Sequence, residues 1–363
     1  KTQVGPPKDF GDDIRRGVWH MNLASISETP AMLAPERPRV ATIAVSIVNY
    51  RSADLVVAAL PALLDELARF ERHAVVIVDN ASPGDDAERL AAHVAAEGLG
   101  DRVRLVRSPR NGGFAAGNNL AFAEIAGLEW TPDAVLLLNP DAEVRPGAVE
   151  EMARVMASSP RIGVVGARLA NPDGSTWVAA FNFPSALSEF AMTTGLGTLI
   201  RRFPRLIADA ETPVRCDWVS GAAMLVRREA LADVGGMDEG YFLYFEEIDF
   251  MHRLAQAGWE TWHAPHAVIA HAAGSSTGML DGKPLSGRMP DYWFASWRRY
   301  FSKFHGPAYA RIAAALRLLG MGVGWTQRRL RGRPYPLAEG FWRDFAVKAL
   351  FGRMTAPSRG RAP

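Results

Sequence analysis

The stretch Val40-Ala-Thr-Ile-Ala-Val-Ser-Ile-Val48 is a short run of apolar and β-branched residues, which predicts a strand buried on both faces. A helical pattern follows it at 53–70. The alternation then repeats, with strands predicted at 73–78, 102–106 and 134–138 and helices at 85–96, 115–128 and 147–158. Strands that alternate with helices indicate an α/β fold, in which helices cover both faces of a mostly parallel sheet.

The pattern changes on both sides of this region. Residues 1–39 contain five prolines and no sustained periodicity, which predicts an N-terminal extension. Beyond residue 160 a helix is predicted at 246–258, and shorter strand-like stretches occur at 162–169, 175–181, 216–226, 260–262 and 267–270. Residues 292–351 have a helical pattern. We therefore expect an α/β domain over 40–290 and a helical C-terminal region over 291–363.

The composition of the 363 residues, 48% hydrophobic and 22% charged, is typical of a globular protein with a core. Cys216 is the only cysteine, which excludes an internal disulfide and a cysteine-based zinc site. Residues 1–17 lack the apolar core of a signal peptide, and no run of about 18 uncharged apolar residues predicts a spanning helix. These features predict a cytoplasmic protein, either soluble or peripheral at the inner face of the cell membrane.

The net charge of +2 conceals a basic C-terminal region. From Trp297 onward the chain carries 14 Lys or Arg and two acids, whereas the preceding 296 residues carry 27 bases and 37 acids. A basic region on an acidic body suggests an anionic surface as partner. We expect a membrane surface and no nucleic acid, because no recognised nucleic-acid-binding module accompanies the charge.

Two segments could dock on anionic lipid. Residues 308–331 are apolar, with arginines at one end and Trp325 close to them, and residues 187–205 combine apolar side chains with paired arginines. An interfacial helix has this pattern, with tryptophan at the level of the lipid headgroups. A helix that packs into the core and has a solvated basic end has the same pattern.

Polar side chains follow two of the predicted strands. The strand at 75–78 ends in Asp79 and Asn80, before Ser-Pro-Gly, and the strand at 136–138 is followed by Asn139, Asp141 and Glu143. In parallel sheets ligands bind beyond the carboxyl ends of the strands, and a carboxylate there can hold Mg²⁺ or Mn²⁺. An ordinary turn and a capped turn before a helix are the alternative interpretations.

A glycine-rich segment lies between these two strand ends. Asn111-Gly-Gly-Phe-Ala-Ala-Gly-Asn-Asn119 places two adjacent glycines before a helix, where the backbone can approach an anionic ligand closely. Its spacing is neither that of a Walker loop nor Gly-x-Gly-x-x-Gly.

An acidic cluster and a histidine lie further along the chain. Glu246, Glu247 and Asp249 stand in the first turn of a helix, behind the aromatic run at 241–245. Acids complement a helix dipole at this position, but a carboxylate among aromatic side chains also gains the raised pKa that a general base needs. His271 follows an apolar strand and precedes Gly-Ser-Ser, and it is either structural or a ligand.

In this order the motifs resemble glycosyltransferase family 2, over roughly residues 45–276, and most of all its bacterial rhamnosyltransferase and galactofuranosyltransferase branch. The resemblance implies the nucleotide-sugar-binding fold called GT-A. It also implies positions that bind the nucleotide sugar, namely Asn49, Tyr50, Arg51, Asp79, Asn80, Gly113, Phe114, Asn118, Asn139 and Asp141. Asp79 matches the acid that contacts a pyrimidine base.

The resemblance also implies catalytic, metal and acceptor positions. Asn139-Pro-Asp141 stands where the family has Asp-x-Asp, so Asp141 is the expected ligand of Mg²⁺ or Mn²⁺, and His271 matches a histidine that completes the metal site in some relatives. Glu247 matches the catalytic base, with Glu246 and Asp249 as the other candidates. The acceptor side matches Trp218, Ser220 and Gly221.

These matches imply an inverting, metal-dependent transfer of a sugar from a nucleotide diphosphate. The expected donor is dTDP-rhamnose, with UDP-hexose or UDP-galactofuranose as the alternative. The expected acceptor is a hydroxyl of a growing, lipid-linked bacterial surface polysaccharide. Two other classes compete with this interpretation. A nucleotidyltransferase would carry a basic, glycine-rich signature near the first strand, which 45–52 lacks. A nucleotide-sugar-binding scaffold without turnover agrees with the departures at Asn139 and Glu247.

Overall fold

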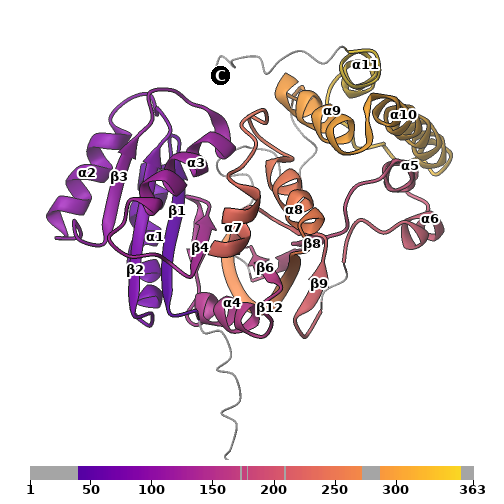
Figure 1. Ribbon diagram of the computed structural model, residues 1–363. Coiled ribbons are helices and arrows are strands. Elements are labelled where there is room, and N and C mark those ends of the chain that lie inside the picture. Colours follow the sequence, from indigo (N-terminus) through magenta and orange to yellow (C-terminus); the bar gives the residue numbers. More distant parts are fainter. Residues whose placement is uncertain (1–39, 172–173, 178, 208–209, 272–286, 353–363) are drawn as a thin grey trace, which may run out of the picture. The chain divides into compact units, whose positions relative to one another are not determined.

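The centre of the protein is a mixed ten-stranded β-sheet (Figure 1). A computed structural model describes residues 40–171, 174–177, 179–207, 210–271 and 287–352, which belong to one compact unit. The strands follow one another across the sheet as β3 (Val103–Arg107), β2 (Arg72–Asp79), β1 (Thr42–Asn49), β4 (Ala134–Leu138), β11 (Ala223–Arg227), β6 (Ile162–Ala170), β12 (Glu260–His271) and β5 (Ala142–Val144). Two further strands pair with this series, β7 (Thr176–Trp177) with β6 and β9 (Val214–Cys216) with β12.

The first four strands of this order are parallel, as the alternating sequence predicts. β11 then runs antiparallel to both β4 and β6, and β12 runs parallel to β6. Because β11 is antiparallel, its beginning meets the carboxyl end of β4, with Ala223 opposite Leu138. Segments that enter β11 therefore reach the same edge of the sheet as segments that leave β1, β2 and β4.

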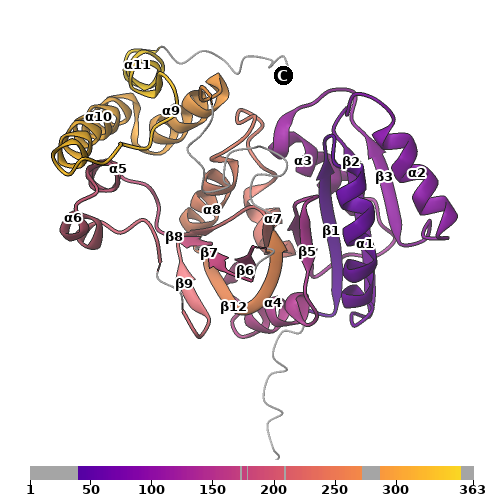
Figure 2. The same cartoon turned by 180° about the vertical axis from the view of Figure 1, so that it is seen from behind.

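Helices cover both faces of the sheet (Figures 1 and 2), which confirms the predicted α/β class. One face packs against α1 (Ala53–Leu67) and α4 (Ala148–Ala157), and α2 (Asp86–Ala96) contributes Leu90 to that core. The other face packs against α3 (Gly113–Ala126), α7 (Arg228–Val234) and α8 (Glu246–Gln256). Alternate residues of β1 divide between the two cores, with Val45 in the first and Ala44 in the second, because successive strand side chains point to opposite faces.

The C-terminal region forms a helical unit on the second face. It consists of α9 (Asp291–His305), α10 (Pro307–Leu330), α11 (Phe341–Phe345) and a π-helical turn at Ala346–Leu350. Two helices from the middle of the chain, α5 (Ala186–Thr194) and α6 (Gly197–Arg202), join it, and α5 packs along α10 (Figure 1). A small sheet of β8 (Ala180–Phe181) and β10 (Trp218–Val219) lies before β11 in the chain.

The structure can be compared with the strands, the boundary and the extension that the sequence predicts. The pieces expected at 260–262 and 267–270 belong to the single strand β12, whose pairing with β6 shifts register between Ala264 and Val268. The boundary expected at residue 290 stays a prediction: α9 begins at Asp291, and the described residues on both sides belong to one compact unit. The extension expected at 1–39 lies outside the described residues. Among the described residues, no helix combines the length and apolarity required to cross a bilayer.

Candidate active site

The carboxyl ends of β1 and β2 bring Asn49 and Asp79 together. The two residues are opposite each other in the parallel register, and Asn49 Nδ2 donates to Asp79 Oδ1 at 2.9 Å. The other oxygen of Asp79 accepts from the backbone N–H of Ser82 at 3.2 Å. Both side chains are buried, so this pair gives the edge of the sheet a rigid carboxylate that retains lone pairs for a further donor.

The two turns after these strands are strained. Arg51 after β1 and Ala81 after β2 both have a φ of 58°, in the left-handed region that non-glycine residues rarely adopt. The Arg51 backbone N–H donates to Ser82 Oγ at 3.0 Å, which ties one turn to the other. The Arg51 side chain is exposed, with its guanidinium 5.2 Å from the centre of the Tyr50 ring. Arg51 therefore offers a positive charge at the edge where Asp79 lies.

Asn80 and Asn118 use their polar groups within the protein. Asn80 Nδ2 donates to the Gly113 carbonyl at 3.0 Å, and its Oδ1 accepts from the Gly112 N–H at 3.3 Å. Asn118 joins Ser46 of β1 to the Phe114 carbonyl, through bonds of 2.7 and 3.0 Å. Both side chains are buried. Their bonds hold the glycine segment against the sheet.

Gly113 is required by a close backbone approach. Its φ is 82°, and a Cβ atom at this position would lie 1.8 Å from the carbonyl oxygen of Phe242. The next residue, Phe114, donates its backbone N–H to that same oxygen at 3.1 Å. The start of α3 is thereby joined to the aromatic segment that precedes α8.

Glu247 lies beside Phe114 and Gly221. A Cβ atom added to Gly221 would be 3.5 Å from Glu247 Cβ and 3.7 Å from Phe114 Cε1. The residue after Gly221 connects this group to the end of β4, because the Ala222 carbonyl accepts from the Asn139 N–H at 2.9 Å. Tertiary structure thus collects the expected base, acceptor-side and nucleotide-side positions at one edge of the sheet.

The two glutamates at the start of α8 have raised pKa values. Burial raises the pKa of Glu247 to about 7, although backbone N–H groups of the helix start oppose the shift. Burial and the neighbouring Glu247 charge raise the pKa of Glu246 well above its usual range. Glu246 is the more buried of the two, and each has an Oε2 atom without a hydrogen-bond partner. These are the properties that a general base near neutral pH requires.

Asp141 and His271 meet at the other end of this edge. β12 pairs antiparallel with β5, with His271 opposite Ala142, and this register places the imidazole beside Asp141. His271 Nε2 lies 3.2 Å from Asp141 Oδ1 and 3.4 Å from Asn139 Nδ2. The carboxylate and the imidazole are 1% and 7% exposed.

These two groups are suitable ligands for a divalent cation that shares its coordination with a bound phosphate. Mg²⁺ commonly uses one or two carboxylates together with substrate phosphates and water. Within the described ranges, no three His, Cys, Asp or Glu side chains come together as a complete metal site. Asp141 and His271 therefore stay a pair of candidate ligands.

Trp218, Ser220 and Gly221 form a rigid wall at the entrance to β11. Trp218 stacks on Phe181 with ring centres 4.1 Å apart, and its indole N–H donates to the Asn182 carbonyl at 3.1 Å. The Ser220 N–H donates to the Ala179 carbonyl at 3.0 Å. Trp218 is buried and its N–H is used internally, so it supports the wall, whereas Gly221 lies against Glu247.

Asp249 has a different environment from the two glutamates. It is fully buried, and its carboxylate accepts from Tyr241 Oη at 3.0 Å and from Arg253 Nε at 2.8 Å. Lys303 Nζ of α9 lies 2.6 Å from its second oxygen. Because these donors already occupy both oxygens of the Asp249 carboxylate, Glu247 and Glu246 are the better candidates for the base.

Sequence reasoning missed the partners of these residues. Tyr244 and Phe245 directly precede the glutamates, and both have positive φ values, 68° and 71°. Lys303 lies 54 positions beyond Asp249, within a region interpreted only as helical and basic. The unusual aromatic run at 241–245 was the only signal for the strained turn, and nothing local to Lys303 indicated its partners.

Comparisons with known proteins identify relatives of this chain and of its fold. Residues 38–283 match the model of the family described as "Glycosyltransferase like family 2". An N-acetylglucosaminyl-diphospho-decaprenol L-rhamnosyltransferase of Mycobacterium tuberculosis is 32% identical over 252 residues, which are 66% of this chain and 81% of the relative. Rhamnosyltransferase WbbL of Escherichia coli K12 is 31% identical over 163 residues, 43% of this chain and 60% of that protein.

Two solved structures share the fold. The mannosyltransferase PcManGT from Pyrobaculum calidifontis, solved with GDP-Man and Mn²⁺, has a TM-score of 0.51 at 16% identity, over 90% of this chain and 92% of that one. GalNAc-T7, solved with UDP, GalNAc and Mn²⁺, has a TM-score of 0.51 at 13% identity, over 85% of this chain and 58% of that one. At these identities the likeness concerns the fold alone.

Proposed function

Because the chain belongs to glycosyltransferase family 2, we propose that it transfers a sugar from a pyrimidine nucleotide diphosphate to an acceptor hydroxyl, with inversion at the anomeric carbon. The chain is a glycosyltransferase related to rhamnosyltransferases, and it has the GT-A fold. The observation that carries the proposal is the position of Glu247. It lies against Gly221, at the sheet edge that holds Asp79 and Asp141, and its pKa is about 7.

The proposed chemistry is a single displacement. Glu247 accepts the proton of the acceptor hydroxyl while that oxygen attacks the anomeric carbon from the face opposite the diphosphate. Gly221 leaves space beside Glu247 for the acceptor oxygen, because a side chain there would contact both Glu247 and Phe114. One new glycosidic bond forms as the bond to the diphosphate breaks, so the anomeric configuration inverts without a covalent enzyme intermediate.

Asp141 and His271 would hold the divalent cation, Mg²⁺ or Mn²⁺. Their 3.2 Å separation and low exposure suit two ligands of one ion. When bound, the cation would neutralise charge on the diphosphate leaving group. Asn139 contacts His271 and orients it, because the amide lies 3.4 Å from the imidazole. Both solved structures that share the fold contain Mn²⁺, which is consistent with a divalent cation but does not identify its ligands.

The donor proposal rests on Asp79 and on the relatives. Uracil and thymine each have a ring N–H that can donate a hydrogen bond to a carboxylate held in a fixed position. Asp79 is such a carboxylate. The two relatives named as rhamnosyltransferases favour dTDP-rhamnose over UDP-hexose and UDP-galactofuranose. The name of the mycobacterial relative describes an acceptor carried on diphospho-decaprenol, which supports a lipid-linked acceptor for this chain.

A thermal-shift comparison of dTDP, UDP and GDP, each with Mn²⁺, tests the donor. At a concentration about 100-fold above Kd a ligand stabilises the folded state by about 2.7 kcal/mol, enough to raise Tm by several degrees. We expect this shift with dTDP and UDP. A shift with GDP alone would contradict the pyrimidine assignment. Binding without transfer to any lipid-linked acceptor would favour a scaffold over an enzyme.

The pH dependence of kcat tests the base. Glu247 must be ionised to accept a proton, and burial raises its pKa to about 7. We therefore expect kcat to rise with pH through a midpoint near 7 and to reach a plateau above it. An ordinary solvated glutamate, with a pKa of about 4.5, would give a plateau already at pH 6. If the pH midpoint of kcat instead lies near 4.5, the base is a group other than Glu247.

A further inference from the structure

Exposed large apolar side chains are concentrated in the C-terminal helical unit. In the part of the chain that the structure describes, seven of the ten such side chains lie within 307–352. Two more are Leu187, which is in α5, and Leu206, which follows α6. α5 packs along α10, so the two segments that the sequence analysis singled out separately are neighbours. A soluble protein rarely gathers its exposed apolar side chains in one region without a partner.

Helix α10 has apolar residues on two opposite faces. The inner face is closely packed, since a Cβ atom at Gly320 would lie 2.6 Å from the Phe190 carbonyl of α5. On the outer face Ile312, Leu319 and Leu330 are 55%, 58% and 83% exposed. Their spacing of 7 and 11 residues places them on one side of the helix. Core packing explains the inner face but not the outer one.

Two exposed tryptophans border the solvent-exposed side of α10, but Trp325 lies six positions after Leu319 and therefore about 120° around the helix from it. Trp325 is 47% exposed, and the Arg329 guanidinium lies 5.5 Å from the centre of its ring. Trp342 of α11 is also exposed, and its ring lies 3.7 Å from the Cβ position of Gly322, so it lies beside α10. Tryptophan at the border of an apolar face suits the boundary between lipid headgroups and acyl chains.

Most of the exposed charges around this face are positive. Residues 308–330 contain no acid. The arginines at 311, 328, 329, 331, 333 and 343 are exposed. Of the two acids within 307–352, Asp344 is buried and paired with Arg288, which leaves Glu339 exposed. An apolar face bordered by arginines complements an anionic lipid surface electrostatically.

We propose that the outer face of α10, with Trp342 of α11, docks on the surface of an anionic lipid bilayer. The helix has 24 residues and is therefore about 36 Å long, and it would lie parallel to the membrane plane. Leu319 and Trp325 would enter the headgroup region, and the arginines would contact lipid phosphates. This proposal is independent of the proposed sugar transfer, although it would bring the active site to a lipid-linked acceptor.

Vesicle flotation of the full chain tests the docking face. Wild-type protein is expected to bind vesicles of equal parts phosphatidylglycerol and phosphatidylcholine, and to lose most of this binding on pure phosphatidylcholine or at high salt. The double variant Leu319→Gln/Trp325→Gln should bind about tenfold or more weakly, because it removes buried apolar area. Arg329→Gln/Arg331→Gln should have a similar effect on anionic vesicles.

Leu55→Gln is the matched control, since Leu55 is an exposed apolar residue on α1 and should not affect vesicle binding. All altered side chains are exposed, so unchanged melting temperatures are expected. Wild-type vesicle binding by both double variants would overturn the proposal. A second result would also overturn it: the wild type is a dimer, and the Leu319→Gln/Trp325→Gln variant is a monomer that still binds vesicles. The face would then be covered by a second copy of the chain.

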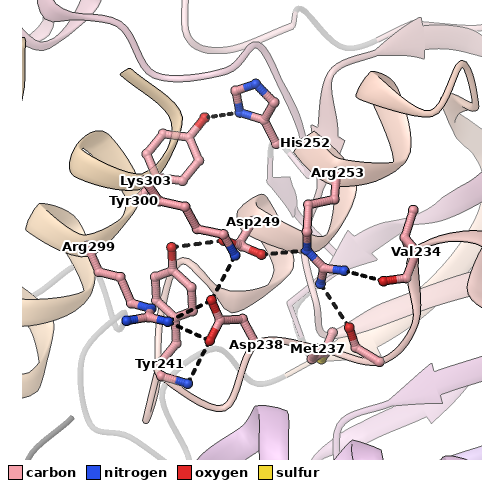
Figure 3. Close-up of polar contacts among 12 residues, drawn as sticks. Val234, Met237, Asp238, Tyr241, Asp249, His252, Arg253, Arg299, Tyr300 and Lys303 are labelled. Atoms are coloured by element: carbon pink, nitrogen blue, oxygen red, sulfur yellow. Dashed lines mark hydrogen bonds and ion pairs between the residues drawn. The ribbon is translucent and has the colours of Figure 1, made fainter. Parts of the chain in front are cut away.

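A second proposal concerns the segment that carries the glutamates, and it rests on the proposed role of Glu247. Figure 3 shows Lys303 of α9 between Asp238 and Asp249, which stand at the two ends of this segment. Lys303 Nζ lies 2.7 Å from Asp238 Oδ2 and 2.6 Å from Asp249 Oδ2. Arg299 adds two bonds of 2.8 Å to the Asp238 carboxylate.

The charge state of Asp238 agrees with this clamp. Burial would raise the pKa of Asp238, but hydrogen bonds from Lys303 and Arg299 hold it at about 2. Between the two aspartates, Ser296 Oγ of α9 donates to the Leu243 carbonyl at 3.0 Å. The C-terminal helix therefore contacts both ends and the middle of one segment.

The clamped segment contains the strained turn. Tyr244 and Phe245 have positive φ values, and a bulky residue keeps such a backbone only where its surroundings enforce it. Phe245 packs against Tyr300 of α9, with ring centres 5.7 Å apart. The turn is followed immediately by Glu246 and Glu247. We propose that Lys303 is a positioning residue, which holds this turn and thereby keeps Glu247 beside the acceptor oxygen.

Lys303→Met tests the positioning role by kinetics and hydrogen exchange. We expect kcat to fall about tenfold or more with donor KM within about twofold, because small displacements of a base are costly. Amides of 239–247 should exchange faster, and Lys303→Arg should restore part of kcat. Lys348→Met is the matched control, because Lys348 also bridges two acids, Asp291 and Asp344, and is similarly half-buried.

Two results would overturn the clamp. One is a Lys303→Met enzyme whose kcat per folded molecule and exchange in 239–247 equal those of the wild type. The other is an equal loss of kcat in Lys348→Met, which would indicate general destabilisation. Either result together with an inactive Glu247→Gln variant would leave the proposed function intact.

Discussion

Glu247→Gln is expected to reduce kcat by about 10²–10⁴-fold while donor binding stays close to that of the wild type, because general-base catalysis contributes about this factor. The substitution keeps the shape of the side chain beside Gly221 and Phe114 but removes the proton acceptor. Single-turnover transfer from the nucleotide sugar gives the rate, and calorimetric titration with the nucleotide diphosphate gives the affinity.

Thermal unfolding excludes misfolding as the cause. The folded-state pKa of Glu247 is raised to about 7 from an ordinary value of 4.5, so the carboxylate costs stability as pH rises through this interval, and the cost is complete above pH 7. Gln removes that cost. We therefore expect Tm of the variant at pH 8 to equal or exceed that of the wild type, and the difference to disappear below pH 4.

Three further variants identify the carboxylate that acts. Glu97→Gln is the control, because Glu97 is exposed at the end of α2 and far from the site in the chain. Full activity of Glu247→Gln would transfer the role to Glu246 or Asp249, and Glu246→Gln and Asp249→Asn would distinguish these two. Because Asp249 is held by Arg253, Tyr241 and Lys303, we expect Asp249→Asn to lower Tm as well as activity.

Asp141→Asn is expected to abolish Mn²⁺ binding to the complex with nucleotide diphosphate and to lower transfer by about 100-fold or more. A divalent cation contributes several kcal/mol to stabilising a charged leaving group, and Asn supplies a neutral, weaker ligand. The direct readout is Mn²⁺ binding measured by electron paramagnetic resonance, with and without UDP or dTDP. Because the protein provides two ligands, we expect tight binding only when the diphosphate is present.

His271→Gln should weaken Mn²⁺ binding less than Asp141→Asn, since it leaves the charged ligand in place. Asp101→Asn is a suitable control, because Asp101 is an exposed acid in the loop before β3. Wild-type transfer in the presence of a chelator, combined with unaltered kinetics of Asp141→Asn, would contradict the metal site. It would leave the assignment of Glu247 unaffected, since the base and the metal ligands are separate groups.

The α/β fold class could be predicted from the sequence because each strand and helix of the parallel half is recognisable within its own short segment. Each strand of the parallel half, such as Thr42–Asn49, is an apolar run long enough to be buried on both faces, and each crossover is a helical stretch. The antiparallel strand β11 and the full length of β12 were harder to predict from the sequence. The pairing of β11 with β4 and of β12 with β6 joins residues more than 80 positions apart, and the shift in β12 near Pro265 broke one strand into two apparent pieces.

The candidate site was predictable as a set of positions but not as an arrangement. Asp79, Asp141 and Glu247 were found because polar residues ended apolar strands or clustered at a helix start. Their individual roles depended on neighbours. Asn80 and Asn118 stay predictions for the nucleotide side, and the structure adds that their side chains bond to the glycine segment, while Asp249 is held in ion pairs.

The sequence alone determined the alternation of strands and helices, the polar residues at the strand ends and the basic character of the C-terminal region, because each of these is written in neighbouring residues. Tertiary structure decided which carboxylates are free and which are neutralised. Asp249 and Glu247 are two residues apart and equally acidic in sequence, but only Asp249 faces Lys303 of α9. The physical reason is that pKa and charge pairing depend on burial and on distances of a few ångströms, and those distances are set by packing between segments far apart in the chain.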